Sequence, residues 1–239
     1  MCGFVCVINR NRNFPGAISK NVLNHRGPDH TSQITHGCVS MRHWRLSIVD
    51  LNERSNQPID RLNNLFMYNG EIYDFKKISK YYFNKIYKSD TLFFLDMLLE
   101  GKRKELKNLS GFYSYVLLDK QKQVLEGGRD IWGKKPLYYY IDDKQAIFSS
   151  EEQGIISILN QNTKINKKSL LNYIIYKNTF FGQSYFQNIR EISPGGSFFF
   201  DIKNWKFSIS LDWNHYYSIP FKEMIDSSFV KLNNENDIS

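Results

Sequence analysis

The chain has 239 residues, enough for one large domain or for one domain with an appendage, and for an apolar core that needs neither disulfides nor a structural metal. Its formal net charge is +8, but the lysines are scattered along the chain and no apolar stretch approaches the roughly 20 residues that span a bilayer, so we expect neither a nucleic-acid nor a membrane partner. Three cysteines without a CxxC pair indicate neither a disulfide framework nor a zinc site, and they fit a reducing, cytoplasmic compartment.

The first part of the chain predicts strands and one helix. Gly3–Ile8 is a short apolar run rich in β-branched residues, which is typical of a buried strand. A helix is expected over Ala17–Asn24. Further strands are expected over three segments, Cys38–Met41, Leu46–Val49 and Leu65–Tyr68. The last of them is predicted to stop at Asn69 and Gly70, because this pair is a strong turn signal.

The rest of the chain alternates between predicted helices and closely spaced short strands. A helix is expected over Ile72–Tyr82, and Ser89–Thr91 caps a second helix over Leu92–Leu99. Four strands joined by tight polar turns follow, over Phe112–Leu118, Gln123–Gly127, Leu137–Ile141 and Ala146–Ser149. Two helices, a hairpin and an amphipathic helix are then expected over Glu151–Leu159, Lys167–Tyr176, Glu191–Ile209 and Phe221–Leu232. This order favours an α+β fold with antiparallel sheets covered by helices.

Cys2 is the first candidate for chemistry. Methionine aminopeptidases remove Met1 when the next residue is small, so we expect Cys2 to be the N-terminal residue of the mature chain. Its α-amino group, with an ordinary pKa of about 7.7–8.0, then lies beside a thiol with an ordinary pKa of about 8.5. The amine can accept the thiol proton directly or through one water, so this nucleophile needs no catalytic histidine. Cys6 and Cys38 are expected in the core.

A series of short motifs runs along the chain in a definite order. They are Met1–Phe4, Asn24–Asp29, Arg45–Leu51, Gln57–Ile59, Tyr68–Tyr73, Ser89–Thr91, Gly128–Asp130, Gly133–Tyr139 and Phe148–Glu151. Over about residues 2–200 this series resembles the glutaminase domain of glutamine-dependent asparagine synthetases, a class II glutamine amidotransferase. The resemblance implies the αββα sandwich of N-terminal-nucleophile hydrolases, with two antiparallel sheets between helical layers. It also implies that the domain hydrolyses L-glutamine to glutamate and ammonia.

The resemblance implies three catalytic residues. Cys2 would attack the side-chain amide of glutamine and form a γ-glutamyl thioester. Asn69, through its side-chain amide, and Gly70, through its backbone N–H, would stabilise the oxyanion of the tetrahedral intermediate. No metal is implied, and the five histidines have no metal-ligand spacing.

The resemblance also implies a set of substrate-binding residues, which includes Asn69 and Gly70. Arg45 would bind the α-carboxylate of glutamine, a task that suits a planar, always charged guanidinium. Asp90 would pair with the α-ammonium, helped by the backbone around Glu71. The remaining implied pocket residues, which contribute mainly backbone groups, are Leu46, Ile48 and Val49.

In the family a synthetase half follows, opened by a Ser-Gly-Gly-x-Asp-Ser loop that binds ATP, and this sequence contains no such loop. We therefore predict a glutaminase domain over residues 1–205 and, over 206–239, a linker and first helix that lead toward a synthetase domain. No cofactor is expected in this chain, since ATP and Mg belong to the synthetase half. An ammonia-accepting synthetase domain or subunit is the expected partner. Arg129, Asp130 and Lys135 look like scaffold or ammonia-exit residues without a chemical step.

Two alternatives remain open at this point. The chain can be a regulatory module that binds glutamine without turnover, or a glutaminase that serves an acceptor other than aspartate. Sugar-amidating and phosphoribosyl-amidating relatives usually carry an Arg-Trp-Ala-Thr type of segment where this chain has Arg45–Val49. This difference favours the asparagine synthetase branch.

Overall fold

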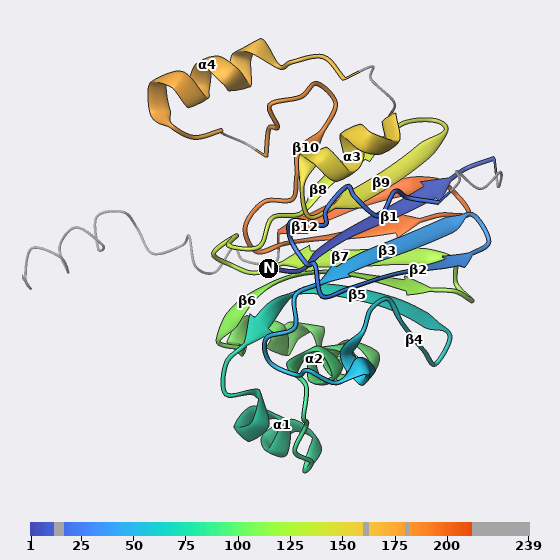
Figure 1. Cartoon of the computed structure of the whole chain (residues 1–239), viewed down its shortest axis with the longest axis vertical. Helices are drawn as coiled ribbons and strands as arrows, with labels where there is room; N and C mark the ends of the chain where they lie inside the picture. The colour runs from blue at the N-terminus through green and yellow to red at the C-terminus, as the bar shows by residue number, and fades with distance from the viewer. Residues whose placement is uncertain (12–16, 160–162, 180–181, 212–239) are drawn as a thin grey trace, which may run out of the picture.

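The computed structural model of the protein describes residues 1–11, 17–159, 163–179 and 182–211. Two six-stranded antiparallel sheets lie face to face at its centre (Figure 1). The first, with strand order β10-β8-β9-β1-β3-β2, comprises β1 (Gly3–Asn9), β2 (His30–His36), β3 (Val39–Arg45), β8 (Tyr138–Ile141), β9 (Gln145–Ser149) and β10 (Arg190–Glu191). The second, with strand order β12-β11-β7-β6-β5-β4, comprises β4 (Ile59–Arg61), β5 (Asn64–Ile72), β6 (Gly111–Asp119), β7 (Val124–Arg129), β11 (Gly196–Asp201) and β12 (Lys206–Leu211).

Helices cover the outer faces of both sheets. Against the second sheet lie α1 (Phe75–Phe83), α2 (Asp90–Leu99) and the 3-10 helix η2 (Arg103–Asn108), whereas α3 (Glu152–Leu159) covers the first sheet. The structure also contains the 3-10 helix η1 (Glu53–Ser55) and the helix α4 (Lys167–Tyr176). The predicted α+β class and the sandwich of two antiparallel sheets between helical layers are thus confirmed. Within the described ranges, no helix has the length and apolar character needed to cross a membrane.

Strand β1 shows how the apolar pattern builds the sandwich. Its side chains alternate, so that Phe4 and Cys6 point into the core between the sheets while Val5 and Val7 point outward to the cluster that includes Ile155 of α3. A strand buried on both faces must be apolar throughout, which explains the continuous apolar run at the start of the chain. Cys6 is fully buried, as predicted, and burial raises the pKa of its thiol far above the ordinary value.

Helix α2 is fixed at its start and along its apolar face. Ser89 is the N-cap, and its side chain accepts a hydrogen bond from the backbone N–H of Leu92 at 3.4 Å, as the sequence predicts. The Phe94 ring packs against Tyr68 of β5 and Tyr113 of β6, with centroid distances of 4.9 and 4.8 Å. Aromatic packing therefore holds the helix against the second sheet, and its first residue, Asp90, lies beside Ile72 at the end of β5.

Two local predictions before β4 are wrong. Residues 17–24 contain turns in place of a helix, because the Lys20 carbonyl accepts the Trp44 indole N–H at 2.6 Å and is not available to a helical ladder. Residues 46–49 form a loop and not a strand, and the Ser47 N–H donates to the Asp29 carboxylate at 2.7 Å. In both segments a contact distant in sequence competes with the local preference.

Strand β5 continues through the pair that was predicted to end it. Asn69 lies opposite Ser114 and Gly70 opposite Tyr113, and the pairing with β6 runs on to Ile72. The edge strand β2 was not predicted, because its residues are polar, partly buried and without an apolar alternation. The division after residue 205 stays a prediction, although β12 pairs with β11 and extends the sheet to residue 211. The expected helix over 221–232 lies outside the described residues.

Candidate active site

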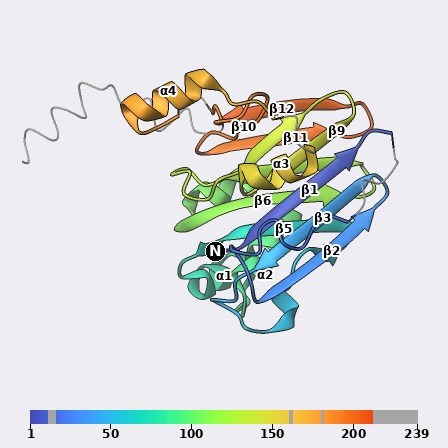
Figure 2. The same cartoon turned by 45° about the horizontal axis from the view of Figure 1, so that its top comes forward.

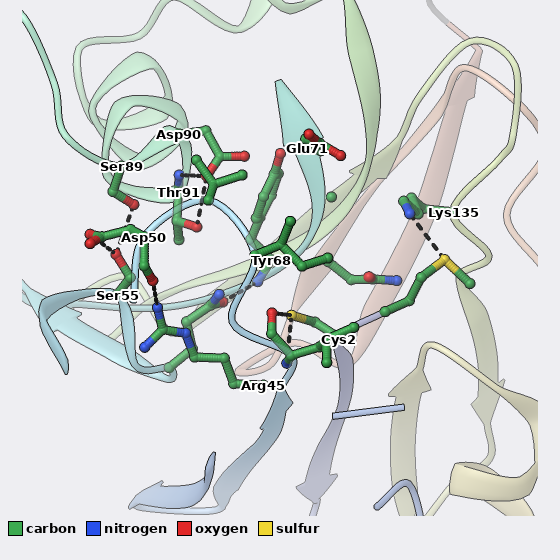
Figure 3. A pocket seen from close by; sticks show the side chains of 17 residues that line it. Cys2, Arg45, Asp50, Ser55, Tyr68, Glu71, Ser89, Asp90, Thr91 and Lys135 are labelled. Carbon is green, nitrogen blue, oxygen red and sulfur yellow. Dashed lines mark hydrogen bonds between the residues drawn. The ribbon is translucent and has the colours of Figure 1, made fainter. Parts of the chain in front are cut away.

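A pocket lies where the chain before β1, the loop after β3, the middle of β5 and the start of α2 meet (Figure 3). Every site residue that the sequence predicted lines this pocket: Cys2, Arg45, Leu46, Ile48, Val49, Asn69, Gly70, Glu71 and Asp90. These residues come from segments far apart in the sequence, so the tertiary structure brings them together. Their individual chemical roles stay predictions, and the geometry below says what each can do.

Cys2 presents its sulfur to the pocket from the end of the chain. Its Sγ lies 3.4 Å from the backbone N–H of Leu46, which donates to it. Burial raises the pKa of the Cys2 thiol, and the Leu46 N–H, the nearby terminal amine and Arg45 offset only part of this effect. The thiol is therefore protonated near neutral pH and needs a base before it can act as a nucleophile.

The main chain beside the sulfur is held by a buried arginine. Arg26 Nε donates to the Cys2 carbonyl at 2.8 Å, and Arg26 Nη1 pairs with the Glu151 carboxylate at 2.6 Å. Met1 is 53% exposed, which leaves it accessible for removal. Burial lowers the pKa of the terminal amine, and so do the charges of Arg26 and Lys135, although the Cys2 thiolate acts in the opposite direction. An amine at this end of the chain is thus inclined toward its free-base form.

Asn69 brings an unused donor to the pocket. The residue is only 1% exposed, and its side-chain Nδ2 has no hydrogen-bond partner within the described part of the chain. Leaving such a group unsatisfied costs about 1–3 kcal/mol, so an orphan amide is unusual unless it has a function. The Nδ2 can donate to an oxygen atom that enters with a substrate.

Gly70 directs its backbone N–H to the edge of β5 that faces away from β6, which β4 leaves unpaired beyond Phe66. Peptide groups of alternate residues in a strand point to the same side. The N–H of Tyr68, two residues before Gly70, donates to the Gln57 side chain at 2.6 Å, and the N–H of Ile72, two residues after it, donates to Asp90 at 3.2 Å. The Gly70 N–H therefore points away from β6 and toward the pocket. A Cβ at Gly70 would lie 2.5 Å from the Phe112 carbonyl oxygen, so only glycine fits at this position.

A neutral histidine lies beneath this edge. His43 is fully buried, and burial lowers its pKa to about 3 although the Tyr68 carbonyl favours the charged form. Its Nε2 lies 3.2 Å from that carbonyl, so the imidazole carries its proton on Nε2 and donates it. The carbonyl and the N–H of Tyr68 are both satisfied by side chains, which fixes β5 just before Asn69 and Gly70.

The Arg45 guanidinium organises the loop at one side of the pocket. Its Nη1 donates to the Asn52 carbonyl at 3.0 Å and to Asn56 Oδ1 at 2.6 Å, and its Nη2 donates to the Asp50 carbonyl. Three of the five N–H donors of an arginine are thereby used. The two remaining donors, the Nε–H and the second N–H of Nη2, lie side by side on one edge of the guanidinium. Neither donates a hydrogen bond to another residue in the described part of the chain. That edge suits a bidentate contact with a carboxylate.

Asp90 places a buried carboxylate at the other side. It accepts N–H groups from Ile72 at 3.2 Å and from Thr91 at 2.8 Å, and no ion pair with a cation is formed among the residues described. Burial raises the pKa of the Asp90 carboxyl, while the two backbone N–H groups act to lower it. A buried carboxylate without a cation is suited to bind an ammonium group that enters from solvent.

The pocket therefore combines a thiol, two available N–H donors, a free guanidinium edge and a buried carboxylate. A comparison of the sequence with protein families agrees with this geometry: residues 1–213 match the glutamine amidotransferase domain. The chain belongs to this family. The predicted resemblance is thus confirmed, and the pocket is the candidate active site of an amidotransferase domain.

Curated relatives of this amidotransferase domain include long asparagine synthetases. The chain is 30% identical over 191 residues to a putative glutamine-hydrolysing asparagine synthetase 2 of Methanocaldococcus jannaschii, an alignment that covers 66% of the chain and 37% of the relative. It is 28% identical over 252 residues to asparagine synthetase 1 of Bacillus subtilis, with 99% of the chain and 37% of the relative covered. The chain thus spans little more than a third of the length of these relatives.

Solved structures show the same fold at low sequence identity. A Bacillus subtilis glutamine phosphoribosylpyrophosphate amidotransferase, solved with ADP and GMP, superposes with a TM-score of 0.62 at 14% identity. The alignment covers 89% of this chain and 50% of the other. At this identity the similarity supports the sandwich fold of the amidotransferase domain.

Several pocket residues of the amidotransferase domain were not predicted as site residues. Lys135 lines the pocket with its Nζ 3.1 Å from the Met1 sulfur, and burial together with Arg26 lowers its pKa. Ser55 Oγ lies 2.8 Å from Ser89 Oγ and 2.8 Å from the Asp50 carboxylate, which links the loop to the start of α2. Lys135 stands in a quoted motif, Gly133–Tyr139, but the sequence does not show which of its residues face the pocket.

Proposed function

We propose that the domain hydrolyses L-glutamine to glutamate and ammonia through a thioester at Cys2, and that it supplies the ammonia to an ATP-dependent synthetase part similar to that of asparagine synthetases. The single observation that carries the proposal is the pair of N–H donors that β5 presents to the pocket. The orphan Nδ2 of Asn69 and the outward N–H of Gly70 lie in the pocket that also contains the Cys2 sulfur. Two donors beside a nucleophile are what a tetrahedral acyl intermediate requires.

The reaction begins after removal of Met1, which makes the α-amine part of Cys2 itself. The amine accepts the thiol proton, and the sulfur attacks the amide carbon of glutamine, so that an S–C bond forms and the carbonyl oxygen gains negative charge. Asn69 and Gly70 donate to this oxyanion. Collapse of the intermediate breaks the C–N bond, and the ammonium form of the α-amine returns its proton to the leaving ammonia.

Water completes the cycle. With the α-amine again a free base, it accepts a proton from the water that attacks the thioester. The C–S bond then breaks, the ammonium form of the amine returns this proton to the departing sulfur, and glutamate and the thiol are released. The free edge of Arg45 binds the α-carboxylate and Asp90 binds the α-ammonium throughout. These two groups recognise the parts of glutamine that do not react, which positions the amide at the sulfur.

The test is intact mass after incubation with 6-diazo-5-oxo-L-norleucine, a glutamine analogue that alkylates such thiols. We expect one adduct, mapped to Cys2 on a chain without Met1, and blocked by excess glutamine. The Cys2→Ala variant, folded as judged by circular dichroism, should neither be labelled nor release ammonia. Cys38→Ala is the matched control and should be labelled like the unmodified chain.

The result also separates the alternatives. Glutamine binding without an adduct or ammonia would contradict the hydrolase proposal and favour a binding module. An adduct together with amidation of an acceptor other than aspartate would retain the Cys2 chemistry and change the synthetase partner. An adduct at Cys38 in place of Cys2 would contradict the assignment of the nucleophile.

A further inference from the structure

Helix α4 exposes an apolar surface that the proposed chemistry does not use. Leu171 is 55% exposed, Ile174 59% and Ile175 57%, and Leu170 beside them is 41% exposed. Residues three and four apart lie on the same side of a helix, so these four side chains form a continuous strip, which we call the α4 apolar face. Figures 1 and 2 show α4 standing away from the two sheets. Contiguous exposed apolar surface in a globular protein marks an interaction site.

The helix is anchored although its apolar face is exposed. Its one buried residue, Ser169, donates through Oγ to Gln183 Oε1 at 3.1 Å, and the Asn166 side chain caps the helix by accepting the Ser169 N–H at 3.3 Å. The Tyr173 ring packs edge-on against Tyr185 with a centroid distance of 5.5 Å. The α4 apolar face is therefore presented in a defined orientation, which lowers the entropic cost of binding.

The charges around this face specify the chemistry of what covers it. The sequence contains no acidic residue from residue 153 to residue 190. Four lysines lie in or beside α4: Lys164, Lys167, Lys168 and Lys177. A second copy docked through the same face would place these lysines against each other, which is unfavourable. The complementary surface is apolar at its centre and carries carboxylates at its border.

We propose that the α4 apolar face is the docking surface for the ammonia-accepting synthetase part, which contributes an apolar surface bordered by carboxylates. The inference rests on the proposed function. The chain covers 37% of the length of each of the two asparagine synthetases described above, so the larger part of such a relative has no counterpart in this chain. Ammonia released into water is mostly protonated to ammonium, which is not a nucleophile, so an acceptor held against the amidotransferase domain receives more of it in reactive form. An anchored apolar helix can hold an acceptor in this position.

The test is a binding titration of the full chain with a defined probe, the purified part of Bacillus subtilis asparagine synthetase 1 that this chain does not match. The double variant Leu171→Ser/Ile175→Ser should bind the probe at least tenfold more weakly than the unmodified chain. The matched control is Ile86→Ser, because Ile86 is 62% exposed and lies outside α4. The control should bind like the unmodified chain, and the labelling of Cys2 by the glutamine analogue should be equal in all three proteins.

Several results would overturn the docking proposal. These are a failure of the unmodified chain to bind the probe, equal binding by the double variant, and an equal loss of binding in Ile86→Ser. Self-association in sedimentation velocity that the double variant abolishes would assign the face to a second copy. Flotation with phosphatidylserine vesicles that the double variant abolishes would assign it to a membrane. Unlabelled Cys2 with probe binding that depends on Leu171 and Ile175 would contradict the glutaminase chemistry and still support the docking surface.

Discussion

Replacement of Asn69 by leucine is expected to separate catalysis from stability. Leucine has the branching and the number of side-chain heavy atoms of asparagine but no polar atom, so Asn69→Leu removes the buried Nδ2 that has no partner in the described part of the chain. Relief of an unsatisfied buried donor is worth about 1–3 kcal/mol. The methyl groups of leucine are larger than the amide group, and overpacking of this kind costs about 1–3 kcal/mol. The two effects oppose each other, so the free energy of unfolding should stay within about 2 kcal/mol of that of the unmodified chain.

Activity should fall by far more than the stability changes. Loss of one oxyanion donor lowers kcat by about 100- to 1,000-fold, or roughly 3–4 kcal/mol of transition-state stabilisation. The assays are urea unfolding for stability and glutamate release at saturating glutamine for kcat. Ser114→Ala is the matched control, because Ser114 lies opposite Asn69 on β6 and its Oγ is also buried without a partner among the described residues. This control should keep its stability and its kcat, since Ser114 is not among the residues that line the pocket.

The reasoning fails if stability and activity change together. A loss of more than about 3 kcal/mol of unfolding free energy in Asn69→Leu would mean that the amide is a structural group, because overpacking alone does not account for such a loss. A kcat within about threefold of the unmodified chain would mean that Nδ2 does not contact the oxyanion, since one donor is worth far more than that.

The remaining predictions concern the other groups of the pocket. Gly70→Ala places a Cβ 2.5 Å from the Phe112 carbonyl oxygen, so β5 must shift. We expect kcat to fall by about 100-fold and the midpoint of urea unfolding to drop. Normal kinetics would contradict the assignment of the Gly70 N–H as an oxyanion donor. In Arg45→Lys, the lysine ammonium cannot both hydrogen-bond the loop and bind a carboxylate with two bonds. The KM for glutamine, measured by steady-state kinetics, should therefore rise about tenfold or more with a smaller change in kcat. Burial raises the pKa of the Asp90 carboxyl, and only the ionised form pairs with an ammonium, so KM should fall as pH rises through that raised pKa. In Asp90→Asn, KM should stay high at every pH, and a persistent acid limb in the KM profile would assign the titration to another group.

The sequence predicts most elements whose preferences are local. The apolar run of β1 indicates a strand buried on both faces, and Ser89 marks the start of α2 because its hydroxyl satisfies a free backbone N–H. The four strands β6 to β9 also lie within a residue or two of their predicted positions. Such signals depend on only a few neighbouring residues, so they predict structure without knowledge of the rest of the chain.

The wrong predictions share one physical cause. Residues 17–24 lose a helix because the Trp44 indole, distant in sequence, takes the Lys20 carbonyl. Asn69 and Gly70 stay in a strand because β6 pairs with them, which outweighs their preference for a turn. The polar edge strand β2 forms because its backbone pairs with β3, and its sequence has no apolar alternation that would predict a strand. Long-range contacts decide these segments, and a single sequence does not list them.

The candidate site divides in the same way. The ordered series of motifs identifies the candidate residues. The thiol of Cys2, the guanidinium of Arg45 and the carboxylate of Asp90 are therefore predicted from the sequence alone. Only the tertiary structure decided that they share one pocket and that Lys135 lies in it. It also decided which backbone N–H groups face the pocket. Strand β4 pairs with β5 only at its beginning, from Asn64 to Phe66, so the rest of that edge remains for side chains and substrate. Because the peptide groups of a strand alternate, this open edge turns the N–H of Gly70 toward the pocket that Cys2 also lines.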